Sequence, residues 1–237
     1  MPTRLTRDER DHYRQSGWVV PAATLPEELL APARTVIQTL AREQPWPDLL
    51  SGIHNPFGHH ACTKDAWVFL DIAESAALLD LVEDVCGLDL ILWDSELAFD
   101  LAVLPRDEAE CWPVQPLAGA IAAVSPANGR VLLIDITRLT TTPLPAPAGP
   151  HYILRYMPAT SHYNRDPRFP PNRHAAEVRP LVNHATRPIW LVRGEDHGDN
   201  DFATGFSPPA ARWAEKDWLS AALRGNNASK GDRSCPS

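Results

Sequence analysis

The chain has 237 residues, of which 44% are hydrophobic and 22% charged, and its net charge is −8 at pH 7. This length and composition allow one large globular domain with a substantial core. The acidic balance argues against nucleic acid or an anionic membrane surface as the main partner, because both attract basic surfaces. Residues 1–15 lack the apolar stretch of a signal peptide, and no apolar run could span a bilayer, so we expect a cytoplasmic protein.

The predicted elements begin with helices and one short strand. Residues 5–16 are strongly charged and predict a surface helix that ends at Gly17. Residues 18–21 (WVVP) predict a strand closed by proline. Residues 26–42 and 73–85 carry apolar side chains at helical spacing and predict two amphipathic helices.

The rest of the chain is dominated by strand patterns. Residues 88–104 are rich in aliphatic and aromatic side chains and predict one long strand or two short ones. Further strands are predicted over residues 118–124, 131–136, 151–157 and 188–192. A last helix is predicted over residues 208–223, before a polar tail that we expect to be disordered, residues 225–237. The order predicts a single domain, residues 1–224, that is mainly β with flanking helices: a helix-buttressed sandwich of the jelly-roll type.

Proline is the compositional outlier, with 24 residues, or about twice its usual share of roughly 5%. Many of them lie in residues 143–150 and 167–180. Because proline has no backbone N–H and a fixed φ, both stretches are predicted to be loop or extended segments rather than helices.

One stretch carries the strongest indication of chemistry. Residues 105–107 (PRD) are followed closely by residues 110–116 (ECWPVQP). This arrangement resembles the active-site strand of the phytanoyl-CoA dioxygenase-like family of Fe(II)/2-oxoglutarate-dependent oxygenases, which carries a His-x-Asp pair before an aromatic-Trp-Pro run. The resemblance implies a double-stranded β-helix (jelly-roll or cupin-like) fold. Asp107 stands in the place of the Asp and Pro105 in that of the His.

The resemblance also implies an Fe(II) site made by two His and one carboxylate, with 2-oxoglutarate as cosubstrate. Asp107 is the expected metal ligand. Residues 127–134 (ANGRVLLI) resemble the segment that leads to the second His, but none follows at the expected place. In one alignment the His segment and a strand are absent, which would leave the sandwich incomplete. In the other, Thr140 or Thr141 takes the place of the His. With both His ligands missing, the sequence provides no complete iron site.

A second stretch, residues 151–158 (HYILRYMP), resembles the family's strand after the second His. Arg155 on this strand is the candidate for binding the distal carboxylate of 2-oxoglutarate, since a guanidinium pairs with a carboxylate through two parallel hydrogen bonds. The alternative for Arg155 is an ordinary buried ion pair. Trp112 and Trp190 are interpreted as core residues. The C-terminal histidines are interpreted as surface groups: His162, His174, His184 and His197.

Three functional hypotheses follow, and no catalytic residue is assigned. The first is oxidation of a small molecule, by hydroxylation or desaturation in specialised metabolism. The second is a non-catalytic pseudoenzyme that assists an active homologous oxygenase subunit. The third is a shortened gene product that lacks a segment near residue 135. A small-ligand-binding module without iron ancestry is the remaining alternative.

Overall fold

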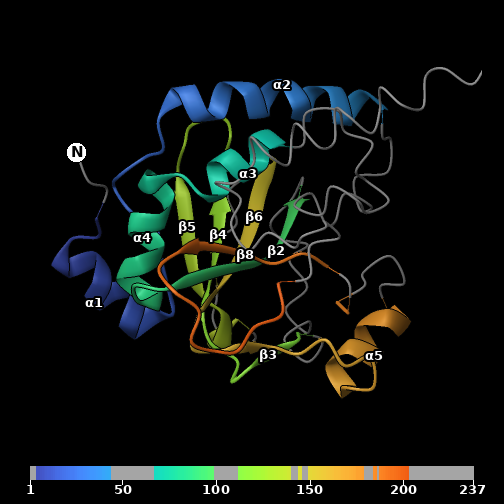
Figure 1. Ribbon diagram of the computed structural model, residues 1–237. Helices are drawn as coiled ribbons and strands as arrows, with labels where there is room; N and C mark the ends of the chain where they lie inside the picture. Colours follow the sequence, from blue (N-terminus) through green and yellow to red (C-terminus); the bar gives the residue numbers. More distant parts are fainter. Residues whose placement is uncertain are drawn as a thin grey trace, which may run out of the picture.

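The computed structural model describes residues 4–43, 67–98, 112–139, 144–145, 149–178, 184–185 and 187–202. Its centre is an antiparallel six-stranded sheet in the order β1-β5-β4-β6-β2-β8, and a second sheet pairs β3 with β7 (Figure 1). The strands are β1 Trp18–Val19, β2 Leu90–Ala98, β3 Val114–Gln115, β4 Ala120–Val124, β5 Val131–Asp135, β6 His151–Pro158, β7 His162–Tyr163 and β8 Trp190–Arg193.

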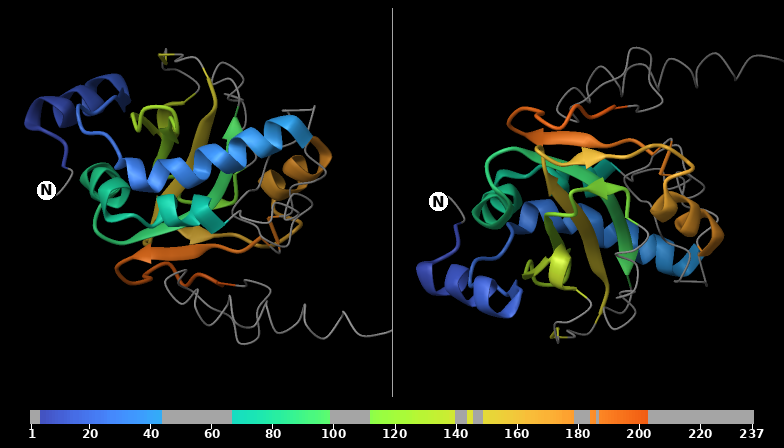
Figure 2. Two further views of the ribbon diagram at one scale, coloured as in Figure 1. Left: turned by 90° about the horizontal axis from the view of Figure 1, so that it is seen from above. Right: turned by 90° about the horizontal axis from the view of Figure 1, so that it is seen from below.

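Helices flank the large sheet, and α2, α3 and α4 lie together against one of its faces (Figures 1 and 2). The helices are α1 Arg7–Ser16, α2 Glu27–Glu43, α3 Trp67–Ala73, α4 Ala76–Cys86 and α5 Pro170–Val178, with a 3-10 turn at Ile136–Arg138. Within the described ranges, none of these helices combines the length and the apolar character that a membrane crossing needs.

Local sequence explains where α1 begins and ends. The Thr6 side chain accepts a hydrogen bond from the backbone N–H of Glu9, and the Glu9 carboxylate accepts one from the N–H of Thr6. This capping box satisfies two of the donors that a helix N-terminus leaves open. At the other end Gly17 adopts φ 77°, a left-handed conformation that glycine reaches without steric cost. The predicted helix and its stop are therefore confirmed.

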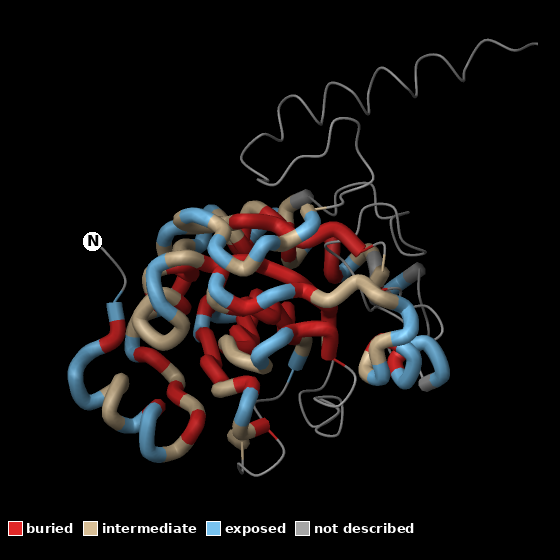
Figure 3. The backbone as a smooth tube through the Cα atoms, turned by 60° about the horizontal axis from the view of Figure 1, so that its bottom comes forward, coloured by how far each residue is buried: buried red, intermediate tan, exposed pale blue. Residues whose placement is uncertain are grey.

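The large sheet carries a hydrophobic core on each face, because successive strand residues point to opposite sides. On β6, Tyr152, Leu154 and Tyr156 face the helices. Ile153 and Met157 face the other way, toward the small sheet and α5. Burial is concentrated on the strands in the middle of the molecule, and exposed stretches lie on the surrounding helices (Figure 3). The second core is the interior of a sandwich closed by the β3–β7 pair.

Most predicted elements are present, with boundaries shifted by a few residues. The strands predicted over residues 118–124, 131–136, 151–157 and 188–192 correspond to β4, β5, β6 and β8. The sequence did not predict α3 or the two-residue strands β3 and β7. Residues 99–104, 208–223 and 225–237, on which further predictions were made, lie outside the described residues.

One prediction is wrong: residues 170–178, in a stretch expected to lack helix, form α5. Pro170 and Pro171 stand in its first turn, where the backbone N–H groups have no intrahelical acceptor. Proline at these positions removes no helical hydrogen bond, and its fixed φ suits the helix. A proline-rich composition therefore did not exclude a helix here.

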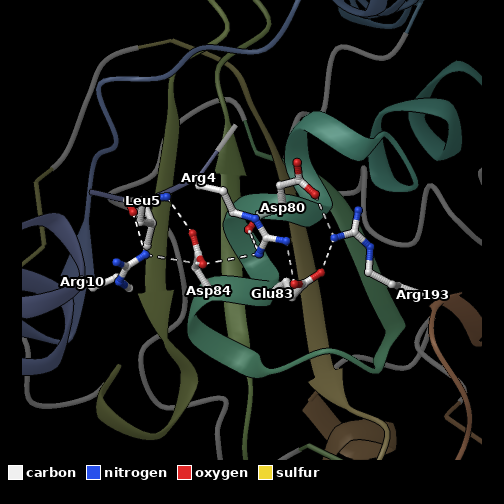
Figure 4. Close-up of polar contacts among 7 residues, drawn as sticks. All are labelled: Arg4, Leu5, Arg10, Asp80, Glu83, Asp84 and Arg193. Carbon is white, nitrogen blue, oxygen red and sulfur yellow. Dashed lines mark hydrogen bonds and ion pairs between the residues drawn. The ribbon is translucent and has the colours of Figure 1, made fainter. Parts of the chain in front are cut away.

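A network of charged side chains joins the N-terminal segment to α4 and β8 (Figure 4). Arg4 lies 2.7 Å from the Glu83 carboxylate, and the backbone N–H of Leu5 donates to Asp84 over 2.7 Å. Arg193 on β8 donates to Asp80 over 3.0 Å and also pairs with Glu83. We call the six charged residues the α4 network: Arg4, Arg10, Asp80, Glu83, Asp84 and Arg193. It fixes the start of the chain to the helical layer.

Candidate functional site

The candidate site lies in the sandwich interior and is shaped by an irregularity in β2. The pairing of β2 with β6 shifts between Leu92 and Asp94, so that Trp93 is an extra residue on the β2 side. Before the shift Leu92 faces the helices, and after it Ser95 pairs with the helix-facing Leu154. Trp93 belongs to the sandwich core, and Asp94 pairs in register with Arg155. The bulge thus places two consecutive side chains on the same face of the sheet.

Four charged residues meet at this place. Arg155 donates from Nη1 to Asp94 over 2.9 Å and from Nη2 to Glu96 over 2.5 Å. Arg187, which precedes β8, donates to the other oxygen of Asp94. All four are buried, with exposed fractions of 1% for Arg155, 4% for Arg187, 6% for Asp94 and 8% for Glu96. We call these four residues the interior cluster: Asp94, Glu96, Arg155 and Arg187.

Aromatic side chains pack next to the interior cluster. The Trp93 and Trp112 rings meet edge to face, with 5.8 Å between their centroids, and the Arg155 guanidinium carbon lies 5.7 Å from the Trp112 ring. Tyr163 and His184 lie on the other side of Trp93, at 6.3 and 6.5 Å between centroids. The Tyr163 hydroxyl is 3.2 Å from Nδ1 of His184. Burial raises the pKa of Tyr163, although Arg187 and Arg165 act in the opposite direction, so its hydroxyl stays protonated.

The structure places the sequence-predicted cofactor residue inward, where a ligand-binding arginine would be expected. Both η nitrogens of Arg155, however, already donate to carboxylates of the chain itself. These two bonds use two of the five N–H groups of the guanidinium. The buried ion pair that the sequence left as the alternative is therefore present, and binding of 2-oxoglutarate by Arg155 stays a prediction.

The predicted iron ligand, Asp107, lies outside the described residues, as do Pro105 and both threonines considered for the second His. In the part of the chain that the structure describes, no three His, Cys, Asp or Glu side chains are grouped so that they could hold a metal ion. His151 is 2% exposed, and its Nδ1 lies 2.8 Å from the carbonyl oxygen of Gly149. Burial lowers the pKa of this imidazole.

Sequence reasoning missed part of the site. His184 was expected at the surface but is buried, at 6% exposed, beside Tyr163. His162, His174 and His197 are exposed, as predicted. The sequence analysis assigned no role to Arg187, Asp94 or Glu96. The spacing of two between Asp94 and Glu96 on a strand was the available signal, because it places both on one face.

The fold and the site together define a helix-buttressed jelly-roll sandwich with a charged interior, which confirms the predicted fold class. A structure of CytC3 with Fe(II) and alpha-ketoglutarate is similar over 90% of this chain and 99% of its own, with a TM-score of 0.54 and 12% identity. A structure of the apo form of ThoJ, a non-heme monooxygenase, is similar over 93% of this chain and 96% of its own, with a TM-score of 0.50 and 14% identity.

At these identities the similarity shows the fold, and the fold is one that non-haem iron enzymes use. The sequence matches no protein-family model, and no curated protein gives a significant match. Any activity must therefore be argued from this chain's own residues.

Proposed function

We propose that this protein is a phytanoyl-CoA dioxygenase-like member of the Fe(II)/2-oxoglutarate oxygenase class and that it serves the oxidation of a small molecule without an iron centre of its own. In this role it is a non-catalytic partner of an active homologous oxygenase. The fold supports the class, because CytC3, solved with Fe(II) and alpha-ketoglutarate, has the same architecture. The family resemblance of residues 105–116 and 151–158 supports the finer assignment.

The observation that carries the non-catalytic role is the pairing of Arg155 with two carboxylates of the chain itself. Two carboxylates occupy its guanidinium, and Arg187 completes the interior cluster. The four charges balance as two positive and two negative, and this balance makes their burial tolerable. A working cosubstrate site needs an arginine with donors available to the incoming carboxylate. Pro105 in the place of a His points the same way, because proline has no side-chain group that binds a metal.

A second candidate is an autonomous oxygenase. It is favoured by Asp107, which keeps the family's carboxylate position relative to Trp112 and Pro113. It requires that substitute ligands complete the iron site. A shortened gene product finds less support, because the similarity to CytC3 extends over 99% of that chain.

An anaerobic titration separates the two candidates. The purified, metal-stripped chain is titrated with Fe(II) and 2-oxoglutarate while their charge-transfer absorption band is followed. For a non-catalytic partner we expect no band and no conversion of 2-oxoglutarate to succinate by the chain alone. A band that disappears in Asp107→Asn but persists in the surface control Asp11→Asn would overturn the proposal in favour of the autonomous enzyme.

The partner role has its own test. The chain is co-expressed with a homologous oxygenase from the same source that has a complete iron site. We expect co-purification and a several-fold higher 2-oxoglutarate turnover by the homologue when the chain is present. Equal turnover with and without the chain, for each such homologue, would contradict the partner role.

A further inference from the structure

Three buried N–H donors near Tyr163 have no acceptor in the described parts of the chain. They are Nε1 of Trp93, Nε of Arg187 and Nη2 of Arg165. An unmatched buried donor is destabilising, and the great majority of such groups have partners. All three groups donate and none accepts. What they lack is therefore a hydrogen-bond acceptor from outside the described residues.

Trp93 and Arg165 lie beside the Tyr163 ring, and the charge of Arg187 also acts on the Tyr163 hydroxyl. The Trp93, Tyr163 and His184 rings form a triangle, with 6.3 to 6.5 Å between centroids along each side. The guanidinium carbon of Arg165 lies 5.0 Å from the centroid of the Tyr163 ring. Arg165 also donates from Nη1 to the backbone carbonyl of Arg187 over 2.7 Å, which brings the two arginines together.

The charge on Arg165 is poorly matched. Its Nη1 donates to backbone carbonyls, and its Nε donates to the carbonyl of Asp201 over 2.8 Å. The one ion pair that Arg165 makes with a described residue is to the Asp201 carboxylate, which is 3.8 Å away and 71% exposed. Water screens such an exposed pair, so its contribution is small. Arg187, in contrast, already shares Asp94 with Arg155. One largely uncompensated positive charge thus lies beside the three unmatched donors.

We propose that Trp93, Arg165 and Arg187, gathered around Tyr163, bind the carboxylate group of a small-molecule ligand. The site is distinct from the ion pairs of Arg155 with Asp94 and Glu96. A single carboxylate matches a single uncompensated charge, and its two oxygens have four lone-pair positions for three N–H donors. The Arg165 side chain is 12% exposed, so the site borders the surface. The inference rests on the proposed function only in taking the ligand to be a small molecule.

The test uses acetate as the probe, with acetamide as its uncharged counterpart and chloride at equal ionic strength. The indole N–H signals of the full chain are followed by ¹H–¹⁵N NMR, and Trp93→Phe assigns the signal of Trp93. We expect acetate to shift this signal with saturation, whereas acetamide and chloride leave it in place. In Arg165→Gln the acetate Kd should rise about tenfold or more, as expected for a lost charged hydrogen bond.

Arg193→Gln is the matched control, because Arg193 pairs with Asp80 and Glu83 of α4 rather than with a residue of the site, and it should leave the acetate Kd unchanged. Signal dispersion in the same spectra reports whether each variant is folded. If Arg165→Gln is unfolded, Arg165→Lys, which keeps the charge, takes its place. The Arg165→Lys variant should raise the acetate Kd by a smaller factor than is expected for Arg165→Gln.

Absence of a saturable shift with acetate in the folded chain, or a shift unchanged in the Arg165 variant, would overturn the inference. Tighter binding of phosphate than of acetate would overturn the assignment to a carboxylate. The titration uses the chain alone, without iron, 2-oxoglutarate or a partner. A negative result with acetate would therefore not decide the outcome of the anaerobic titration or of the co-expression experiment.

Discussion

The molecule contains two groups of ion pairs that differ in their surroundings. The interior cluster joins β2, β6 and the segment before β8 inside the sandwich, and its residues are at most 8% exposed. The α4 network joins the N-terminal segment, α4 and β8 near the surface, and the side chains of Arg4 and Arg193 are 42% and 24% exposed. Both tie together segments distant in the sequence, with pairing distances close to 3 Å.

The same chemical contact has different consequences in these two places. Inside the sandwich, losing one partner leaves its counter-charge without water or a counter-ion, which is destabilising by several kcal/mol. At the surface, water and salt replace a lost partner, and the remaining charge is solvated. The interior cluster therefore specifies one arrangement of the strands, whereas the α4 network adds a small and adjustable amount of stability.

The largest effect is expected for Arg155→Met, which leaves the buried carboxylates of Asp94 and Glu96 with an apolar side chain. The free energy of unfolding should fall by about 3–5 kcal/mol, measured by urea denaturation. The matched variant Arg193→Met should lose less than about 1 kcal/mol, because Arg193 is partly exposed and Glu83 keeps its pair with Arg4. Equal losses in the two variants would remove the distinction between the two groups.

A smaller loss of stability is expected when the pH is lowered. Burial raises the pKa of Glu83, but the hydrogen bonds and charges of Arg4 and Arg193 outweigh it, and the net pKa lies below the ordinary 4.5. Glu83 therefore stabilises the fold above its unfolded-state pKa, and this contribution is lost as the pH falls through the lower folded-state value. Between about pH 5 and 3, the melting temperature of Glu83→Gln should thus fall less than that of the parent chain. Thermal unfolding of both chains at several pH values measures this. An equal fall in the two melting temperatures would contradict this role of Glu83.

The smallest change in stability is expected when the salt concentration is raised. Raising the salt concentration should weaken the pairs of Arg4, because exposed charges are screened within about 10 Å at 0.1 M ionic strength. The difference in unfolding free energy between the parent chain and Arg4→Gln is therefore expected to shrink toward zero in high salt. Denaturation by urea at two NaCl concentrations measures this. A difference that grows with salt would show that Arg4 acts by packing.

Sequence patterns predicted the features that depend on neighbouring residues. The charged run and the stop at Gly17 located α1, helical spacing located α2 and α4, and the aliphatic runs located β4, β5 and β6. The inward position of Arg155 followed from its place on a strand between apolar residues. These features could be predicted because periodicity and capping act over a few residues.

Features that depend on distant partners could not be predicted. Arg187 meets Asp94 across 93 positions of sequence, and no local pattern indicates such a pair. The strands β3 and β7 have only two residues each, which is too short for an alternating pattern. His184 was assigned to the surface from its proline-rich surroundings, but the sandwich buries it against Tyr163. Tertiary contacts decided all three cases.

The bulge at Trp93 has a consequence for how this chain would align with its relatives. Strand β2 has nine residues where its partner β6 has eight, and the extra one is Trp93. Residues on either side keep the facing that an unbulged strand would give them, since Leu92 faces the helices and Asp94 the interior. A relative lacking one residue here would keep every other side chain of the strand in place. A single-residue gap at this position would therefore mark the gain or loss of the tryptophan rather than a change of fold.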